Sequence, residues 1–411
     1  MMTENNVGIH WVLNEQAKTN RYEEKWTAFL KPEIVRETQQ WLMQMEEYEK
    51  TPLIHMRKLA QYLQLDDILI KDEACRFDLN AFKVLGGAYA LVRVICEKLD
   101  KDPASVSLEE LRSQEVKKKL GAILFVTATD GNHGHGLAWA AKKLGHQAHI
   151  FMPKGSSTLR LERIKKEGAE AEITNLNYDD AVRFAQEYAK KHKGVVVQDT
   201  AWENYEKIPG WIMQGYAVMA EEIVETLYVD GEKAPTHVIL QAGVGSFAAA
   251  ILGYFVERYQ DEPPIFIIVE PDQADCYYRS AKINDGLPHS VTGDMDTIMA
   301  GLACGEPNFI AWNIINRYAT AYLSCPDEVA ARGMRILAAP FKGDEAIVSG
   351  ESGAVGIGVL SILMVNESLR ELKEKLDLNQ QSRVLCINTE GDTDPNHYRK
   401  VVWDGKNPYE A

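Results

Sequence analysis

The chain has 411 residues and a formal net charge of -15, and its composition is that of a globular protein. This length exceeds one ordinary hydrophobic core, so we expect two domains or one large α/β unit. The acidic charge argues against nucleic acid or an anionic membrane surface as a partner, and no apolar run reaches the roughly 18–20 residues of a membrane span.

The first part of the chain is expected to be mostly helical. Residues 8–50 mix Trp, Glu and Lys in a helical pattern. The stretch TPLIHMRKLAQYL begins with a turn, and DDILIKDEA predicts a short strand. AFKVLGGAYALVRVICEKL predicts a long helix, because its apolar residues recur about every 3.6 positions. Residues 101–120 are charged and contain a capping-box-like SLEEL, so we expect a surface insertion there.

Strands and helices then alternate regularly. The next strands are predicted at AILFVTAT, QAHIFMP, AEAEIT and GVVVQDT, with helices at HGHGLAWAAKKLG, STLRLERIKKEG and YDDAVRFAQEYAKKH. After a long helix, IMQGYAVMAEEIVETL, and a linker, YVDGEKAP, the pattern resumes with strands at THVILQA, PIFIIVEP and SRVLCINTEGD and a helix at SFAAAILGYFVERY. Such alternation predicts βαβ units. The expected fold class is therefore α/β, with two open α/β domains, mostly parallel sheets and a junction around residues 226–236.

A glycine-rich loop follows the strand THVILQA. Gly243, Gly245 and Ala248 match G-x-G-x-x-A, and Glu270 ends the next strand, as in a dinucleotide fingerprint. Glycines and a helix N-terminus hold any phosphate, including the single phosphate of pyridoxal 5′-phosphate (PLP). The motif does not choose between these ligands, and a tight turn without a ligand remains an alternative.

Polar residues also gather where the strand AILFVTAT ends. Thr127, Thr129, Asp130, Asn132 and His133 fall at the carboxyl end of a parallel strand, where open α/β sheets bind their ligands. An Asx turn with a helix cap is the structural alternative. The nearby H-x-H pattern is too sparse to predict a metal site.

Three further residues are candidates for chemistry. Lys83 stands at the start of a helix, where a cation is unfavourable, so it is either a surface lysine or a nucleophile for a carbonyl. Asp199 ends a predicted strand, and an acid–base pair with Asp130 is one interpretation, but the bare pattern favours a helix cap. Thr389 lies where the last strand meets its loop, suited to a hydroxyl that binds a ligand ring.

In this order, the motifs resemble those of PLP-dependent enzymes of fold type II, the tryptophan synthase β family. AFKVLGGAYA is similar to the lysine motif of that family, TATDGNHGHG to its ring-cradling loop, QAGVGS to its phosphate loop, and NTEGD to the segment that binds the pyridine nitrogen. The resemblance spans residues 50–395. Ala81 and Asp130 replace a usual serine and a usual small residue. With QDTAWENYEKIPGWIMQGY and TIMAGLACGEPN, the pattern looks like that of the diaminopropionate ammonia-lyases.

The resemblance implies a large PLP-binding domain of residues 1–86 and 235–411 and a smaller α/β domain of residues 87–234. It implies catalytic roles for Lys83, Asp130 and Asp199. The residues implied to bind the cofactor are Lys83, Phe82, Asn132, Gly243, Val244, Gly245, Ser246 and Thr389. Those implied to bind the substrate are Thr129, Asp130, Gly131, His133 and Asp199; no metal is expected.

The implied reaction is the elimination of ammonia from both isomers of 2,3-diaminopropionate, giving pyruvate and ammonia. Asp130 is expected to take the α-proton of the D isomer, and Lys83, helped by Asp199, that of the L isomer. A serine, threonine or D-serine dehydratase on the same fold is the nearest alternative, but a hydroxyl leaving group does not call for two carboxylates. An NAD-dependent oxidoreductase leaves Lys83 unexplained, and an inactive PLP scaffold is at odds with the intact lysine and aspartates.

The cellular setting is inferred from weaker signals. The six cysteines are scattered without a CxxC pair, and the N-terminal residues lack the basic-then-apolar pattern of a secretory signal. We therefore expect a cytoplasmic protein with reduced thiols. The family resemblance suggests a homodimer that acts on a small amino acid.

Overall fold

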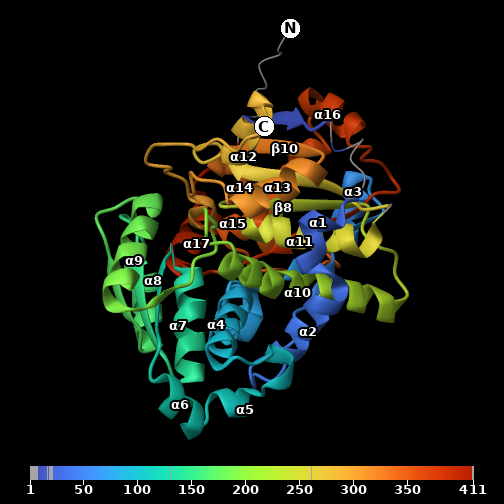
Figure 1. Cartoon of the computed structure of the whole chain (residues 1–411). Helices are drawn as coiled ribbons and strands as arrows, with labels where there is room; N and C mark the ends of the chain where they lie inside the picture. The colour runs from blue at the N-terminus through green and yellow to red at the C-terminus, as the bar shows by residue number, and fades with distance from the viewer. Residues whose placement is uncertain (1–7, 16, 18–21, 130, 261, 410–411) are drawn as a thin grey trace.

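The computed structural model of the chain contains two β-sheets flanked by helices (Figure 1). It describes residues 8–15, 17, 22–129, 131–260 and 262–409. The expected α/β class with mostly parallel strands is confirmed. Strands from the first 72 residues and from residues 237–388 form the larger sheet, and strands from residues 124–196 form the smaller one. The domain boundaries themselves remain a prediction.

The larger sheet has seven strands with a parallel interior. In spatial order the strands are β1 (His10–Leu13), β10 (Ala321–Cys325), β9 (Ile265–Pro271), β8 (His237–Gln241), β11 (Arg383–Asn388), β3 (Asp67–Asp72) and β2 (Leu53–His55). The edge strands β1 and β2 are antiparallel to their neighbours. Along β8, Val238 and Leu240 pack into one hydrophobic cluster and Ile239 into another. Because side chains alternate across a strand, both faces of this sheet are covered.

The smaller sheet has four parallel strands. Their order is β6 (Glu170–Ile173), β5 (Gln147–Met152), β4 (Leu124–Ala128) and β7 (Val195–Val196). The helices that alternate with these strands are α7 (Asn132–Leu144), α8 (Thr158–Lys166) and α9 (Tyr178–His192). In β4, Phe125 packs into the large core cluster while Val126 packs into a separate cluster with α9. The sheet is thus also buried on both faces.

Four helices lie between and beside the sheets: α2 (Pro32–Leu42), α4 (Val84–Leu99), α10 (Lys207–Asp230) and α11 (Ser246–Tyr259). Helix α4 packs against both α7 and α10, and α10 packs against α11. Glycine permits the closest crossing: a Cβ atom at Gly86 would lie 2.5 Å from the Tyr216 ring, and one at Gly215 would overlap the Leu85 carbonyl oxygen. The two sheets are therefore joined through tightly packed helices.

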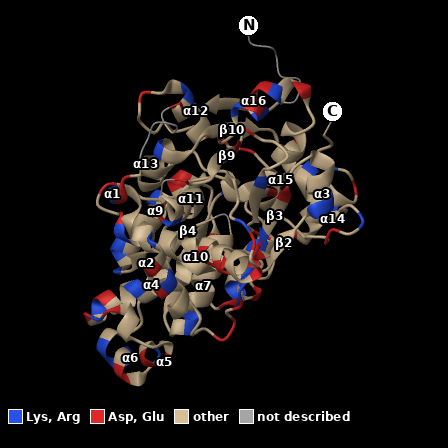
Figure 2. Ribbon diagram, turned by 90° about the vertical axis from the view of Figure 1, so that its right-hand side faces the viewer, with Lys and Arg blue, Asp and Glu red and all other residues tan. Residues whose placement is uncertain are grey.

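The remaining helices and 3₁₀ turns complete the fold. They are α1 (Glu24–Thr27), η1 (Ala28–Leu30), α3 (Arg57–Leu63), η2 (Glu73–Asp78), η3 (Pro103–Ser105), α5 (Leu108–Leu111), α6 (Gln114–Leu120), α12 (Cys276–Ile283), η4 (Ala300–Leu302), α13 (Phe309–Tyr318), α14 (Asp327–Ala338), α15 (Glu351–Leu363), η5 (Glu367–Leu369), α16 (Arg370–Lys375) and α17 (Pro395–Val402). In Figure 2, acidic and basic residues are interspersed on α5 and α6, within the expected surface insertion. Ser107 caps α5 by accepting a hydrogen bond from the Glu110 N–H.

Two expectations from the sequence were wrong. Residues 8–50 are not helical throughout, because His10–Leu13 form the edge strand β1, which pairs with β10. Pairing with a distant strand leaves no local signal. The expected linker YVDGEKAP does not begin at Tyr228, because α10 continues to Asp230 and ends at Gly231 in a left-handed cap. Among the described residues, no single helix is long and apolar enough to cross a membrane; one bent pair, Glu351–Leu363 with Glu367–Lys375, meets that test only in combination.

A fully buried ion cluster ties η2 and β3 to α10. Glu222 Oε2 lies 2.6 Å from Lys71 Nζ and 2.7 Å from Arg76 Nη2, and Arg76 Nε lies 2.7 Å from Glu73 Oε2. Two cations and two carboxylates make the cluster neutral. Burial alone would raise the pKa of Glu222, but the charges of Arg76 and Lys71 hold it well below its ordinary value.

Replacing Glu222 with glutamine is expected to lower the free energy of unfolding by about 3–5 kcal/mol, because two buried cations then share one carboxylate. Urea denaturation of the purified protein measures the change. Glu225→Gln is the matched control on the same helix, because Glu225 pairs with Lys50 near the surface and its loss is expected to cost no more than about 1 kcal/mol. Equal stabilities of the two variants would contradict the role of the cluster.

Candidate active site

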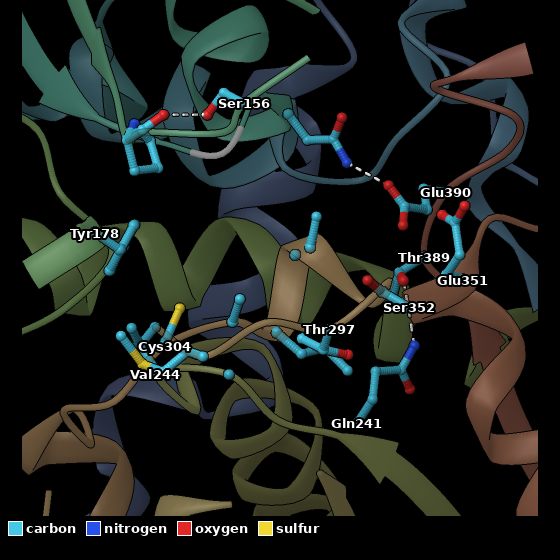
Figure 3. Close-up of a pocket in the computed structure, with 18 of the residues that line it drawn as sticks. Ser156, Tyr178, Gln241, Val244, Thr297, Cys304, Glu351, Ser352, Thr389 and Glu390 are labelled. Atoms are coloured by element: carbon cyan, nitrogen blue, oxygen red, sulfur yellow. Dashed lines mark hydrogen bonds between the residues drawn. The ribbon is translucent and has the colours of Figure 1, made fainter. Parts of the chain in front are cut away.

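A cavity of about 360 Å³ opens where strands of the two sheets end (Figure 3). Its wall includes residues that directly follow β8 and β11 and residues at the start of α4, α11 and α15. Ligands of open α/β sheets bind in this position, at the carboxyl ends of parallel strands. Among the residues expected to bind cofactor or substrate, those that line the cavity are Phe82, Lys83, Asn132, Asp199, Gly243, Val244, Gly245, Ser246 and Thr389.

Lys83 is not a surface lysine. It immediately precedes α4, its side chain is 16% exposed, and its Nζ lies 3.1 Å from Asp199 Oδ2. Burial alone would raise the pKa of Asp199, but the positive charge of Lys83, the electrostatic effect of His133 and the hydrogen bond from Lys83 hold that pKa below its ordinary value. The cavity therefore contains an amine and an ionised carboxylate in direct contact.

Asp199 is held on several sides. Its backbone carbonyl accepts hydrogen bonds from the Ser246 hydroxyl and, at 3.1 Å, from Asn308 Nδ2. The hydroxyls of Tyr178 and Tyr216 each lie 3.5 Å from its carboxylate. The helix-cap interpretation of Asp199 is wrong, because the next helix, α10, begins only at Lys207. Ser246 contributes to the site in an unexpected way, since its side chain positions Asp199.

The loop from Gly243 to Ser246 has the geometry of a phosphate cradle. Gly245 has φ +94°, and a Cβ atom there would overlap the Tyr277 hydroxyl. The Val244 carbonyl accepts hydrogen bonds from the Tyr277 hydroxyl and the Asn308 N–H, both at 2.8 Å. These bonds fix the orientation of the Val244 carbonyl. The first N–H groups of α11 lack partners within the helix and therefore attract an anion.

The position of Glu270 distinguishes the two ligands considered for the glycine-rich loop, a single phosphate and a dinucleotide. Its carboxylate accepts hydrogen bonds from the backbone N–H groups of Tyr277 and Tyr278, at 2.8 and 2.7 Å, and it does not line the cavity. Burial raises its pKa to about 8. A carboxyl engaged in this way is not available to bind a ribose hydroxyl, so the loop fits a single phosphate.

Aromatic and polar side chains gather around Thr389 on the cavity wall. The Phe82 N–H donates to the Thr389 carbonyl at 3.2 Å, which joins the lysine segment to the end of β11. The Phe82 ring packs against the rings of Tyr216 and Phe247, with centroids 4.7 and 4.9 Å away. The Thr389 hydroxyl accepts a hydrogen bond from Gln241 at 3.2 Å. An aromatic wall, a hydroxyl and a lysine at one end, with a phosphate cradle, fit PLP.

The loop after Thr389 bridges the cavity to the smaller sheet. Asn132 Nδ2 donates to Glu390 Oε2 at 2.6 Å, as Figure 3 shows, and Arg160 donates to the Thr393 hydroxyl at 3.0 Å. The Ser157 hydroxyl donates to Asp394 at 3.2 Å. Sequence analysis missed Glu390; its only local signal is a carboxylate directly after Thr389.

The structure describes all residues of the loop TATDGNHG except Asp130. The Thr129 hydroxyl accepts hydrogen bonds from the N–H groups of Gly131 and Gly134, at 3.0 and 3.2 Å, and His133 Nε2 lies 2.8 Å from the Val197 carbonyl. Thr129, Gly131 and His133 do not line the cavity, so substrate binding by them stays a prediction. Asp130 lies outside the described residues.

The fold and the site define the class as a PLP-dependent enzyme of fold type II. The model of the family named "Pyridoxal-phosphate dependent enzyme" matches residues 45–390, and the chain belongs to this family. Diaminopropionate ammonia-lyase of Salmonella typhimurium is 53% identical over 360 residues, which cover 87% of this chain and 89% of that protein. The resemblance to the diaminopropionate ammonia-lyases is thereby confirmed.

Solved structures agree. Escherichia coli diaminopropionate ammonia lyase in complex with an aminoacrylate-PLP azomethine reaction intermediate has a TM-score of 0.89 and 46% identity, covering 98% of this chain and 99% of that chain. The same enzyme in complex with D-serine has a TM-score of 0.90 and 46% identity, covering 98% of both chains. PLP is accordingly the cofactor, as the sequence predicts.

Gly245→Ala is expected to weaken PLP binding at least about tenfold, because the added methyl group must push the phosphate loop away from Tyr277 and costs more than about 1.4 kcal/mol. Binding is measured by titrating the cofactor-free protein with PLP and recording absorbance. Gly155→Ala is the matched control: Gly155 also lines the cavity and has φ +87°, but a Cβ atom there meets nothing within 4 Å. Equal affinities of the two variants would argue against a phosphate at Gly245.

Proposed function

We propose that the protein is a carbon–nitrogen lyase that eliminates ammonia from D- and L-2,3-diaminopropionate and yields pyruvate and ammonia. The observation that carries this proposal is the direct contact of Lys83 Nζ with the buried carboxylate of Asp199 at 3.1 Å. This contact lies in a cavity whose polar walls suit PLP, in a chain about half identical to diaminopropionate ammonia-lyases.

The reaction breaks a Cα–H bond and a Cβ–N bond of the substrate. PLP bound to Lys83 supplies an electron sink for the charge that develops at the α-carbon. The Lys83 amine would take the α-proton on its side of the substrate. The β-nitrogen leaves as ammonia, and the unsaturated product hydrolyses in water to pyruvate and a second ammonia.

A carboxylate explains why the leaving group is an amine. Amines leave readily only when protonated, and an ionised carboxylate favours the ammonium form of a neighbouring amine. Asp199 is ionised and buried beside Lys83, so it is suited to hold the β-ammonium group and to assist proton removal from the L isomer. The corresponding role of Asp130 for the D isomer is part of the proposal.

A dehydratase acting on serine or threonine is the second candidate. The observation in its favour is that a structural relative 46% identical to this chain was solved in complex with D-serine. A hydroxyl group would gain little from an ionised aspartate at the leaving-group position, and this favours the diamine as the preferred substrate. A cytoplasmic homodimer is the setting we propose for the enzyme.

Purified PLP-loaded protein is expected to release pyruvate from both isomers of 2,3-diaminopropionate with a kcat/KM at least about 100-fold above that for D- or L-serine. A lactate dehydrogenase-coupled assay with the four amino acids in parallel measures the ratio. A ratio below one would make the protein a dehydratase, and no pyruvate from any of the four would reject both activities.

Asp199→Asn keeps the size of the side chain but removes its charge, and we expect kcat for the L isomer to fall by about 10²–10⁴. The loss is expected to be smaller for the D isomer, and the visible absorbance of bound PLP is expected to remain. Asp180→Asn is the control, since Asp180 is an exposed carboxylate paired with Arg183. An unchanged kcat for both isomers would exclude Asp199 from the reaction.

A further inference from the structure

Gln241 occupies a buried position beside Thr389. It is the last residue of β8, and Thr389 directly follows β11, the neighbouring parallel strand. Gln241 Nε2 donates to the Ile387 carbonyl at 3.0 Å and to the Thr389 hydroxyl at 3.2 Å. Figure 3 shows Gln241 pointing toward Thr389 at the edge of the cavity.

The direction of these hydrogen bonds is fixed by chemistry. The Ile387 carbonyl has no proton to donate, so only the NH₂ group of the amide can face it. The same NH₂ group faces the Thr389 hydroxyl, which must therefore accept. A hydroxyl carries a single proton, and that proton then points away from Gln241. Among the described residues, no acceptor for this proton lies within hydrogen-bond distance, and Thr389 lines the cavity.

We propose that Gln241 is a positioning residue that makes the Thr389 hydroxyl a hydrogen-bond donor toward the pyridine nitrogen of PLP and thereby keeps that nitrogen unprotonated. The inference rests on the proposed contact of Thr389 with the ring. A donor can bond only to a nitrogen with a free lone pair, whereas an accepting hydroxyl would suit a protonated ring.

The protonation of this nitrogen affects the outcome of the reaction. A protonated ring withdraws more charge from the substrate and favours transfer of the amino group to the cofactor. An unprotonated ring leaves more charge at the α-carbon, where it expels the β-nitrogen. Gln241 would thus select elimination over transamination without touching the substrate.

Other groups on the cavity wall bear on the same nitrogen. The Glu351 carboxylate lines the cavity and is paired with His397. Ser352, next to Glu351, has a buried hydroxyl with no hydrogen-bond partner among the described residues, so it is the rival to Thr389 for the ring contact. The other charged residues that line the cavity are Lys83, Lys154, Arg160, Asp199, Asp294, Asp296, Glu390 and Asp394.

The test is the ¹⁵N resonance of holoenzyme loaded with PLP labelled at the pyridine nitrogen. We expect the wild-type signal at the position of an unprotonated pyridine and the Gln241→Glu signal shifted toward that of a pyridinium. A glutamate at this position has at most one carboxyl proton, and that proton is donated in a hydrogen bond to the Ile387 carbonyl. The Thr389 hydroxyl must then donate its own proton to the new carboxyl group, so that a lone pair of its oxygen faces the ring. The yield of pyridoxamine phosphate per turnover is expected to rise at least about tenfold.

Gln198→Glu is the matched control. Gln198 also donates through Nε2 to a backbone carbonyl, that of Ala128, and to a hydroxyl, that of Tyr178, at 3.0 and 2.9 Å. It does not line the cavity, so its variant is expected to keep the wild-type ¹⁵N resonance. If Gln241→Glu does not fold, Gln241→Met removes the same donor, and its signal is expected to shift in the same direction.

The outcomes separate this inference from the proposed role of Thr389. If Thr389→Val shifts the resonance while the Gln241 variants leave it unchanged, the role of Gln241 is overturned and that of Thr389 stands. If Ser352→Ala shifts it and Thr389→Val does not, Ser352 is the ring partner and both assignments fall. A pyridinium signal in the wild-type protein would also overturn the inference.

Discussion

The placement of Lys83 depends on the buried contact between Glu222 and the two cations Lys71 and Arg76. Arg76 lies in η2, seven residues before Lys83, and Glu222 lies in α10, which packs against the helix that Lys83 opens. Because an unpaired charge in this interior is very unfavourable, η2 cannot move away from α10 without breaking the cluster. The segment from Arg76 to Lys83 is short, and the Phe82 N–H anchors it to the Thr389 carbonyl. The segment that leads to Lys83 is therefore held at Arg76 by the ion cluster and at Phe82 by the hydrogen bond to Thr389.

The site combines rigid elements from both sheets. The phosphate loop and Thr389 come from the larger sheet, Asn132 opens a helix of the smaller one, and Asp199 follows β7. Ser246 connects the larger sheet to the segment after β7, because its hydroxyl donates to the Asp199 carbonyl and Ser246 is the first residue of α11. One residue thus joins the proposed phosphate loop to the segment that carries Asp199.

Much of this site could be predicted from the sequence because its parts follow strands. Gly243 and Gly245 come shortly after β8 and Thr389 directly after β11, and both strands have clear apolar character. Parallel strands bring such positions to one edge of a sheet. Lys83 was ambiguous, since only tertiary contacts distinguish a buried lysine from a surface one. Gln241, Tyr178 and Glu390 were missed because their roles depend on partners from other strands. Strand β1 escaped prediction for the same reason, because it pairs with the distant strand β10.

The loop that follows Thr389 has a consequence for how the cavity opens. The six residues from Thr389 to Asp394 carry the proposed ring contact and three attachments to the helices beside the smaller sheet, through Glu390, Thr393 and Asp394. Any separation of the two sheets large enough to admit a substrate must stretch this segment or detach it. Entry of the amino acid and the proposed contact with the cofactor ring would thus be mechanically linked.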